Sequence, residues 1–372
     1  MLMAKVLDRI DSIGKLRADA LGKSFFFSYS WFKTIEETRA FQVVPKYIAI
    51  YDENCLVAIA PCFIESTSQY QTVEDFLFPR SRKVGKLRHV FHGFVNPSLS
   101  CYSPSSFQSQ IMKNPCFSSS EIFELVLNMI DQLCKTERIM FSSFKFVSQF
   151  DEFLLKSLED VGYFRSFLKS NMYIEPVWDS FDDYLKSVKN SDVRRKIRKE
   201  IRTNRKAGIR IEELKIDSLV NTIPKLYDNL YMKYNRKPSP LTSAFFATLA
   251  HYSPNRTRVF AAKKNDRVVG FSLFLEHQHV WDCYIVGFDY KNLGNNYTYF
   301  NLVFYAPIEK ALQEDVKRIN FRPGTFEAKR RRGCKPEKLF FFIKCQNRLL
   351  APLVSKSLRM IGARLGVPYR SH

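Results

Sequence analysis

The sequence predicts an α/β protein of the α+β type with mixed sheets, in which two similar domains follow one another in tandem. The chain has 372 residues, a length that fits two domains better than one, and 45% of its residues are hydrophobic, which is enough for buried cores. Apolar stretches with strand character alternate throughout with amphipathic stretches of helical period. One order of hairpin, helix and strand occurs in each half, as expected of duplicated domains.

Each half contains its own series of expected elements. In the first half they are a hairpin, a helix with a Ser-rich cap, a strand, a short helix that ends at a glycine, and an extended stretch, at residues 46–65, 119–137, 138–147, 151–162 and 170–177. In the second half they are a strand, two helices, a hairpin, a long strand, a helix and a strand, at residues 209–215, 218–235, 242–252, 258–276, 278–290, 297–316 and 317–321.

Two pairs of segments carry the internal repeat. Residues 47–65 align without a gap with residues 258–276, and both read as two strands around a polar turn. Residues 118–144 resemble residues 295–321, since both contain a polar cap, a helix, a connector and a strand. Chance similarity of two such units is the alternative, and duplication is the favoured interpretation. The predicted division is a first domain, a second domain and a basic amphipathic helix, at residues 1–178, 179–346 and 347–372.

The chain is strongly basic, with 58 Lys and Arg residues against 37 Asp and Glu residues and a formal net charge of +21. Such a charge attracts nucleotide phosphates, RNA or an anionic membrane surface. Eleven basic residues lie between Lys186 and Arg210, against only two acids, Asp192 and Glu200. Like charges one helical turn apart repel, so an anionic partner would stabilise this helix. A solvated helix face is the alternative.

Other features concern the compartment. The eight cysteines lack zinc-ligand spacing, so we expect a reducing cytosol and no metal site. The first residues carry acids and lack a long apolar core, so no signal peptide is expected, and no apolar run is long enough for a transmembrane helix. We therefore expect a soluble, cytoplasmic protein. The helix expected at the C-terminal end would contact an anionic lipid surface or pack on its domain.

Three stretches resemble a known family. They are the basic segment 193–211, the central segment 267–312 and the stretch 324–336, GTFEAKRRRGCKP, which fits the pattern G-x-x-E-x-K-x-x-R-G-x-x-P. Together they resemble the tandem, FemAB-like branch of the GNAT acyltransferases. The resemblance is best over residues 180–340, and in the first half it rests mainly on residues 25–38. It implies two tandem GNAT-like domains, of which the first is degenerate and the second is catalytic.

The resemblance also implies a reaction. The expected enzyme is an N-acyltransferase that moves an acyl group from an acyl-CoA thioester to the amine of a small metabolite or precursor. An aminoacyl-tRNA is the alternative donor, and the product is then an amide or peptide bond. Either donor is a co-substrate, so no permanently bound cofactor is expected. A non-enzymatic alternative is a module that binds RNA or a membrane surface through an inactive GNAT fold.

The stretch 324–336 contains the catalytic residues that the resemblance implies. Lys329 is similar to the lysine that FemAB-like ligases present near the transferred group, where it would stabilise the oxyanion or bind a donor phosphate. Glu327 would share a face with Lys329 on an extended strand and act as a base or as an anchor for the acceptor amine. Arg332 would bind a phosphate or a carboxylate. Without the resemblance, a solvated charge cluster would be the favoured interpretation.

The loop at residues 289–300 is the second expected donor site. It joins the long strand to a helix and contains Gly294. Backbone N–H groups at the start of that helix would face the donor phosphates, namely those of Asn295, Asn296, Tyr297 and Thr298. A plain turn followed by a capped helix is the alternative.

Two further expectations concern single side chains. Tyr290 lies near the end of the long strand and would protonate the leaving group, with packing as the alternative. A tRNA donor would contact the basic helix through four arginines, Arg194, Arg195, Arg198 and Arg202.

Overall fold

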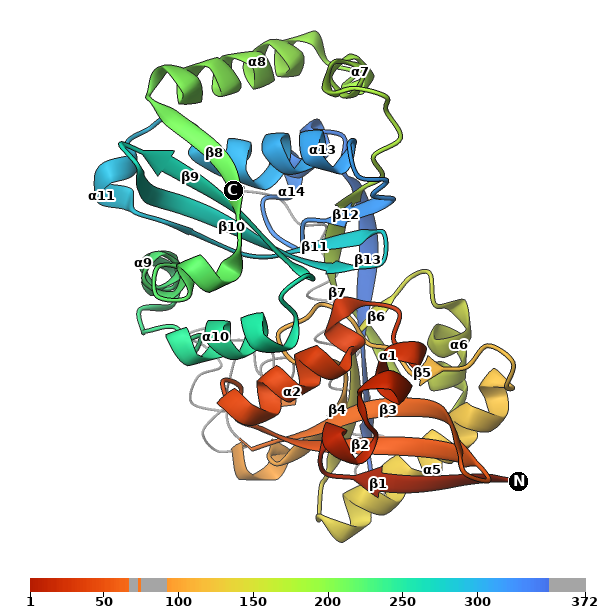
Figure 1. Ribbon diagram of the computed structural model, residues 1–372. Helices are drawn as coiled ribbons and strands as arrows, with labels where there is room; N and C mark the ends of the chain where they lie inside the picture. Colours follow the sequence, from red (N-terminus) through yellow and green to blue (C-terminus); the bar gives the residue numbers. More distant parts are fainter. Residues whose placement is uncertain (67–72, 75–91, 348–372) are drawn as a thin grey trace. The chain divides into compact units, whose positions relative to one another are not determined.

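The chain forms two compact units in a computed structural model that describes residues 1–66, 73–74 and 92–347 (Figure 1). Of these described residues, the first unit contains those within Met1–Lys169 and those from Lys338 to Asn347, and the second contains Ser170–Glu337. Within the described ranges, no helix is both long and apolar enough to cross a lipid bilayer. The helix expected at 347–372 lies, from residue 348 on, outside the described residues.

The first unit is built on a mixed sheet. Its strands are, in order across the sheet, β1 (Leu2–Leu7), β2 (Val43–Asp52), β3 (Cys55–Glu65), β4 (Ser98–Cys101), β6 (Phe141–Ser148) and β13 (Lys335–Cys345), and β5 (Met112–Lys113) pairs with β3. Neighbours are antiparallel except for β4 and β6, which are parallel. The strand that completes this sheet beside β6 therefore comes from a distant part of the chain.

In the described part of the chain, the helices that accompany the first sheet include α1 (Lys15–Leu21), α2 (Tyr29–Thr38), α5 (Ser119–Thr136) and α6 (Glu152–Asp160). Short 3-10 turns, η1 (Ile10–Ser12) and η2 (Phe25–Phe27), precede α1 and α2. The helix α5 begins where the hydroxyl of Ser118 accepts a hydrogen bond from the N–H of Glu121. Its apolar face, which includes Val126 and Ile130, packs into the same core as β2, β3 and β6.

The second unit has a mixed sheet of the same kind. Its strands are, in order, β7 (Phe164–Ile174), β12 (Arg318–Asn320), β11 (Val280–Phe288), β10 (Arg267–His277), β9 (Thr257–Lys264) and β8 (Ile209–Leu214). Only β11 and β12 are parallel. The 3-10 turn η3 (Ile216–Leu219) follows β8.

Helices cover both faces of the second sheet. They are α7 (Phe181–Ser187), α8 (Ser191–Lys206), α9 (Ile223–Asn235), α10 (Ser243–Tyr252), α11 (Tyr290–Leu293), α12 (Thr298–Phe300), the π-helical turn η4 (Asn301–Tyr305), α13 (Ala306–Ala311) and α14 (Phe326–Arg331). On one face, α9 lies so close to β11 that a Cβ on Gly287 would meet the backbone of Leu226 at 2.6 Å. On the other face, the hydroxyl of Ser272 in β10 donates to the carbonyl oxygen of Leu302 in η4.

The two units repeat one order of elements, as the internal repeat predicted. The first has hairpin β2–β3, then β4, α5 and β6, and the second has hairpin β9–β10, then β11, the helices from α12 to α13, and β12. The division of the chain differs from the predicted one. Compact unit two begins at Ser170 and ends at Glu337, because β13 pairs with β6 of the first unit.

The basic segment that precedes β8 in the sequence forms two helices, α7 and α8. The helix α7 begins after Ser180, whose hydroxyl accepts a hydrogen bond from the N–H of Asp183. The chain then leaves the helix at Val188, and α8 begins after Asn190, whose side chain accepts from the N–H groups of Asp192 and Val193. Asn at the N-cap offers the backbone this alternative to a continuing helix, which explains the break.

Candidate functional site

The second sheet opens between its two parallel strands. Strands β11 and β12 pair only at Val280–Asp282 with Arg318–Asn320. Beyond Asp282, β11 continues to Phe288 with β10 on its other side, whereas β12 has already ended. We call Asp282, Tyr284, Arg322 and Lys329, which lie around this opening, the β11-edge site. Beyond Asp282 the edge of β11 has no partner in β12, and at Tyr284 its carbonyl oxygen is bonded by Arg322 instead.

Lys329 is the central cation of the β11-edge site. Its side chain is buried, and its Nζ donates to the carbonyl oxygens of Phe321 and Arg322, at 2.8 Å each. A third carbonyl oxygen, that of Pro323, lies at 3.5 Å and is only weakly bonded. Two of the three ammonium N–H groups are therefore well bonded to the turn after β12, and the third makes only the long contact with Pro323.

The environment of Lys329 alters its titration. Burial disfavours the charged form and lowers the pKa of Lys329 to about 8. Cys283 and Cys334 are nearby and favour the ammonium, and Arg322 opposes it. An amine with a pKa near 8 is mostly charged at pH 7. It loses its proton at a lower pH than an ordinary surface lysine does.

Arg322 extends from the turn after β12 to the open part of β11. Its Nη1 donates to the carbonyl oxygen of Tyr284 at 2.6 Å, and its guanidinium lies 5.2 Å from the centre of the Tyr284 ring. Its backbone has a φ of 62°, in the left-handed region that few side chains adopt. A strained residue held in place by such a contact is typical of functional sites.

Asp282 lies at the closed end of the opening. It is buried on β11, and its Oδ1 accepts from the Nδ2 of Asn320 at 2.9 Å. Burial raises the pKa of Asp282 to about 6, although the hydrogen bond from Asn320 opposes the change. Arg318 donates to Asn320 at 2.8 Å and pairs with Glu337, so Asp282 belongs to a buried polar network. A carboxyl group with a pKa near 6 is suited to accept a proton near neutral pH.

The stretch that was expected to be extended forms the helix α14 instead. Gly324 and Thr325 turn the chain with φ values of 100° and 45°, and the following residues are helix formers. Lys329 and Glu327 therefore do not share a strand face. Glu327 is partly exposed and pairs with Arg330 at 3.1 Å. The expected Glu327–Lys329 pair is wrong, because a helix directs residues two positions apart to different sides.

Arg332 is buried and already has a carboxylate partner. Its Nη2 lies 2.7 Å from the Oε2 of Glu200 in α8, and its Nε donates to the hydroxyl of Tyr305 at 2.9 Å. The guanidinium also lies 3.7 Å from the centre of the Phe300 ring. The carboxylate partner of Arg332 is therefore internal, whereas a donor phosphate or a substrate carboxylate was expected. Arg330 and Arg331 are exposed, as the charge-cluster interpretation predicted.

Tyr290 does not lie on the long strand. The strand β11 ends at Phe288, and Tyr290 begins the short helix α11 with 43% of its surface exposed. The ammonium of Lys233 lies 4.8 Å from the centre of its ring. Tyr290 contributes to the wall of a cavity of about 650 Å³ between α9 and the start of β10. Three cations also line this cavity, Lys225, Arg267 and Lys291.

The expected donor loop is held together from within. Asn204 of α8 donates to the carbonyl oxygen of Asn296 at 3.2 Å and to the hydroxyl of Thr298 at 2.8 Å. The Thr298 hydroxyl in turn donates to Asn296. Tyr297 has a φ of 60°, and Asn295 is exposed. The side chains of Asn296 and Thr298 are thus committed to the loop, and only backbone groups remain for a phosphate.

The helix α8 separates its two kinds of side chain. Val193, Ile197 and Ile201 pack on the second unit's core, whereas Arg195, Arg198 and Arg202 are on the outer face. Arg195 pairs with Asp192, and Arg194 donates to the carbonyl oxygen of Val188 at 2.7 Å. Among the described residues, Arg198 and Arg202 form no ion pair. The outer face of α8 is therefore a row of incompletely neutralised cations, as predicted.

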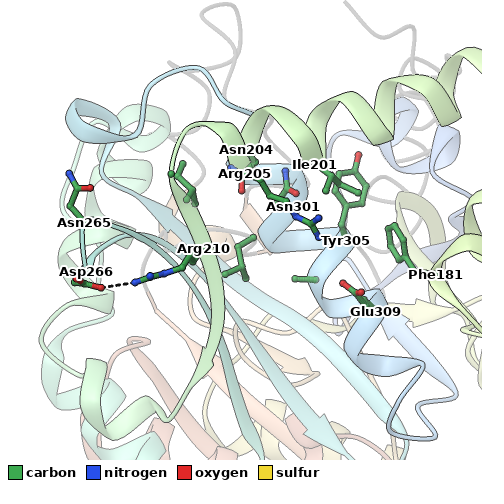
Figure 2. A pocket seen from close by; sticks show the side chains of 14 residues that line it. Phe181, Ile201, Asn204, Arg205, Arg210, Asn265, Asp266, Asn301, Tyr305 and Glu309 are labelled. Carbon is green, nitrogen blue, oxygen red and sulfur yellow. Dashed lines mark hydrogen bonds and ion pairs between the residues drawn. The ribbon is translucent and has the colours of Figure 1, made fainter.

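A second cavity, of about 780 Å³, lies under α8. Figure 2 shows its lining from α8, β8 and the helix that contains η4 and α13, with the ring of Tyr305 directed toward α8. Ile201, Ile209 and Ile211 supply apolar lining, and Arg210 pairs with Asp266 at its edge. Beside this cavity, the contacts of α8 with the rest of the second unit are made by individual side chains. Tyr305 of η4 is one of the side chains that α8 contacts.

In the first unit, the region after the parallel pair is filled by bonded polar side chains. Lys145 of β6 is buried, and its Nζ lies 2.5 Å from the Oε2 of Glu65 in β3. The hydroxyl of Tyr102 donates to the other oxygen of Glu65 at 2.5 Å. The buried lysine of this unit, Lys145, is thus paired with a carboxylate, whereas Lys329 is bonded to carbonyl oxygens. Within the described ranges, no group of His, Cys, Asp and Glu residues is arranged to hold a metal ion.

Sequence reasoning singled out Lys329 but missed Asp282 and Arg322 of the β11-edge site. Asp282 carried a signal, since it is an acid inside an otherwise apolar strand, yet an aromatic strand favoured packing. Arg322 follows the strand RINF directly and precedes Pro323-Gly324, a turn signal that gives no role for the arginine. Its contact with Tyr284 joins two segments that only the fold brings together.

Comparison with known proteins addresses the fold. FemX is similar in structure, with a TM-score of 0.59 and 12% identity over 94% of this chain and all of that chain. A C-terminal domain from Agrobacterium fabrum, described as that of a putative lysylphosphatidylglycerol synthetase, has a TM-score of 0.56 and 11% identity over 95% of this chain and 97% of its own. A tandem GNAT protein from the clavulanic acid pathway has a TM-score of 0.51 and 10% identity over 93% and 99%. No curated protein sequence matches this chain.

These similarities confirm the expected fold of tandem GNAT domains. A family model adds the relationship in sequence. The model named FemAB-like, described as peptidoglycan biosynthesis/recognition, matches residues 9–362 and thus nearly the whole chain. The chain belongs to the FemAB-like family of tandem GNAT-fold acyl- and aminoacyltransferases.

Proposed function

We propose that the chain transfers an aminoacyl group from aminoacyl-tRNA to the amine of a small precursor, with chemistry at the β11-edge site. The outer face of α8 is the observation that favours tRNA. Its row of arginines, which includes Arg198 and Arg202, suits a long polyanion better than a small thioester. A family described by peptidoglycan biosynthesis, and a fold shared with a protein named for a lysyl lipid, agree with an aminoacyl donor.

The proposed reaction needs three events at the reacting carbonyl. The amine nitrogen of the acceptor attacks the ester carbonyl carbon, and a C–N bond forms. The carbonyl oxygen becomes negative, and Lys329 stabilises it through the N–H whose present contact, with the carbonyl oxygen of Pro323, is long at 3.5 Å. The bond from the carbonyl carbon to the ribose oxygen then breaks, and the ribose hydroxyl gains a proton.

The acceptor must lose a proton before it attacks, because an ammonium group is not nucleophilic. Asp282, with a pKa of about 6, is ionised at pH 7 and accepts this proton through water. Arg322 lies between Asp282 and Lys329 in the sequence. Its guanidinium donates a hydrogen bond to the carbonyl oxygen of Tyr284 on the unpaired edge of β11. It keeps the opening in a fixed shape for the donor.

A test is transfer from purified tRNA charged with a mixture of radiolabelled amino acids to a panel of primary amines. We expect transfer by the wild-type protein and none by a Lys329→Met variant. Transfer that persists in the variant would overturn the role of Lys329. Failure of the wild-type protein to bind tRNA at low salt would overturn the tRNA donor.

Acyl-CoA is the second candidate donor, and the cavity beside α11 favours it. This cavity has a volume of about 650 Å³. Three cations in its lining would neutralise the phosphates of a nucleotide, namely Lys225, Arg267 and Lys291. The tandem GNAT protein of similar fold is described with reference to AcCoA. Release of free thiol from acyl-CoA in the presence of amines distinguishes this donor, since aminoacyl-tRNA yields no thiol.

A further inference from the structure

The helix α14 has two anchors. It contains six residues, Phe326–Arg331, which is too short to be stable alone. At one anchor, Lys329 bonds the turn after β12 through its ammonium. At the other, the residue that ends the helix, Arg332, donates through its backbone N–H to the carbonyl oxygen of Lys329 at 2.9 Å. The orientation of Lys329 therefore depends on where Arg332 is held.

Arg332 is held by a buried cluster of side chains. Its Nη2 lies 2.7 Å from Glu200 and its Nε 2.9 Å from the Tyr305 hydroxyl. Its Nη1 donates back to the carbonyl oxygen of Ala328 at 2.9 Å, and its own carbonyl oxygen accepts from the Tyr184 hydroxyl at 3.0 Å. Every nitrogen of the guanidinium plane is thus bonded within the unit, which fixes the residue.

Glu200 supplies the only negative charge of this cluster among the described residues. It is fully buried on the inner face of α8, and its Oε2 also accepts from the Tyr305 hydroxyl. Its Oε1 makes no hydrogen bond within the described part of the chain. Figure 2 shows Tyr305 extending from its helix toward α8, the helix that carries Glu200. Glu200 therefore connects α8 with the end of α14.

We propose that Glu200 is a positioning residue that fixes α14 by way of Arg332, and so sets the place of the Lys329 ammonium. The inference rests on the proposed function for its catalytic meaning, but its geometry does not. The arrangement also couples the inner face of α8 to Lys329, while the outer face of the same helix faces the polyanion. Loss of the Glu200 charge leaves Arg332 without its anion, and α14 then loses one of its two anchors.

A displaced Lys329 would titrate differently. Cys283 of β11, Cys334 after α14 and Arg322 after β12 are the titratable or charged groups that face it. Burial is the main cause of its lowered pKa, and the two thiols oppose that effect. When α14 moves, the ammonium gains water, and its pKa rises toward the ordinary value.

The test measures Lys329 directly and needs no substrate. Competitive labelling of the full chain with acetic anhydride at a series of pH values, followed by mass spectrometry of the Lys329 peptide, gives the pKa and reactivity of this amine. In the wild-type protein we expect a midpoint near pH 8. In Glu200→Gln we expect the midpoint to rise by about one pH unit or more, which corresponds to a tenfold change in proton affinity. An unchanged midpoint in the folded variant overturns the proposal.

Two further variants keep the result decisive. Glu65→Gln removes an equally buried carboxylate from the pair with Lys145 in the first unit, and the midpoint of Lys329 should stay at the wild-type value. If Glu200→Gln fails to fold, the double variant Glu200→Met with Arg332→Met removes both charges and avoids a lone buried cation. It should fold and still show the raised midpoint, and a wild-type midpoint would again overturn the proposal. A raised midpoint with no transfer by the wild-type protein would leave the positioning role and reject the proposed function.

Discussion

The Oε2 of Glu200 and the Nη2 of Arg332 lie 2.7 Å apart, although the two residues are 132 positions apart in the sequence. Both side chains are buried, with 1% and 5% of their surface exposed. The contact joins the basic helix α8 to the motif that contains Lys329. The two stretches, each of which resembled the family in sequence, are therefore in direct contact, and Arg332 is bonded inside the protein.

Replacement of Lys329 by methionine should abolish transfer and remove the rise of stability with pH that this lysine causes. The pKa of Lys329 is about 8 in the folded protein and 10.5 ordinarily, so the unfolded chain binds more protons between these pH values. Stability of the wild-type protein therefore rises with pH from about 8 to 10.5. At pH 7 the buried ammonium costs up to about 3 kcal/mol, because a difference of one in pKa corresponds to about 1.36 kcal/mol. Urea unfolding at pH 7 and pH 10 should show a more stable wild-type protein at pH 10 than at pH 7 through this effect, and the variant should lack this difference.

Replacement of Asp282 by asparagine should increase the free energy of unfolding at neutral pH. The pKa of Asp282 is about 6 in the folded protein and 3.8 ordinarily, so the folded protein binds more protons between these values. Its contribution to stability therefore falls as pH rises from about 4 to 6, by up to about 3 kcal/mol. Thermal unfolding between pH 4 and pH 7 measures this. A variant with the wild-type pH dependence would contradict the titration of Asp282.

The rate of transfer should depend on pH with two limbs. The proposed reaction needs ionised Asp282 and protonated Lys329, whose pKa values are about 6 and about 8. A rate that rises through pH 6 and falls through pH 8 follows, with a maximum near pH 7. The measurement is kcat/KM for the acceptor at saturating donor across pH 5–9. A rate that still increases above pH 9 would show that Lys329 does not act as the ammonium.

Neutralisation of the outer face of α8 should weaken tRNA binding uniformly. A variant with Arg198, Lys199 and Arg202 changed to Gln removes three cations from this helix. For single-stranded or duplex contacts the slope of log K against log salt should fall by about 2–3, since each neutralised phosphate contributes about 0.7–0.9. Filter binding at several salt concentrations measures the slope. The matched control changes Lys15, Lys135 and Lys156, exposed cations of the first unit, and should keep the wild-type slope.

Replacement of Gly287 by alanine should destabilise the second unit. The added Cβ would lie 2.6 Å from the backbone of Leu226 and 2.5 Å from the Phe271 ring, so α9 would have to move away from β11. Overpacking of this kind costs about 1–3 kcal/mol. Urea unfolding compares this variant with Gly93→Ala, where no atom lies within 4 Å of the added Cβ and no loss is expected.

Local patterns in the sequence predicted most of the elements. The hairpins β2–β3 and β9–β10 follow alternating apolar residues around polar turns, and α5 follows a 3.6-residue period with a serine cap. The helix α14 was predicted as extended because its basic residues show no apolar period. The contact of Lys329 with the turn after β12, which stabilises this helix, is not visible in the sequence.

The site was predicted in part for a similar reason. Lys329 could be found from its motif, whereas its neighbours depend on contacts between distant segments. Arg322 acts through the carbonyl of Tyr284, and Arg332 through Glu200, and neither contact is encoded near the residue itself. The assignment of β13 to the first unit has the same origin, since strand pairing over such a distance leaves no local signal.

The pairing of β13 with β6 of the first unit determines the order in which the two units can fold during synthesis. The second unit is a continuous segment, Ser170–Glu337, and can form once that segment has left the ribosome. The first unit must wait for residues up to Cys345, because its strand β6 pairs with Leu339–Cys345. Until then one edge of β6 has free backbone groups beside Phe141 and Phe144, an edge that invites pairing with other nascent chains. The domain that is translated first is therefore completed last.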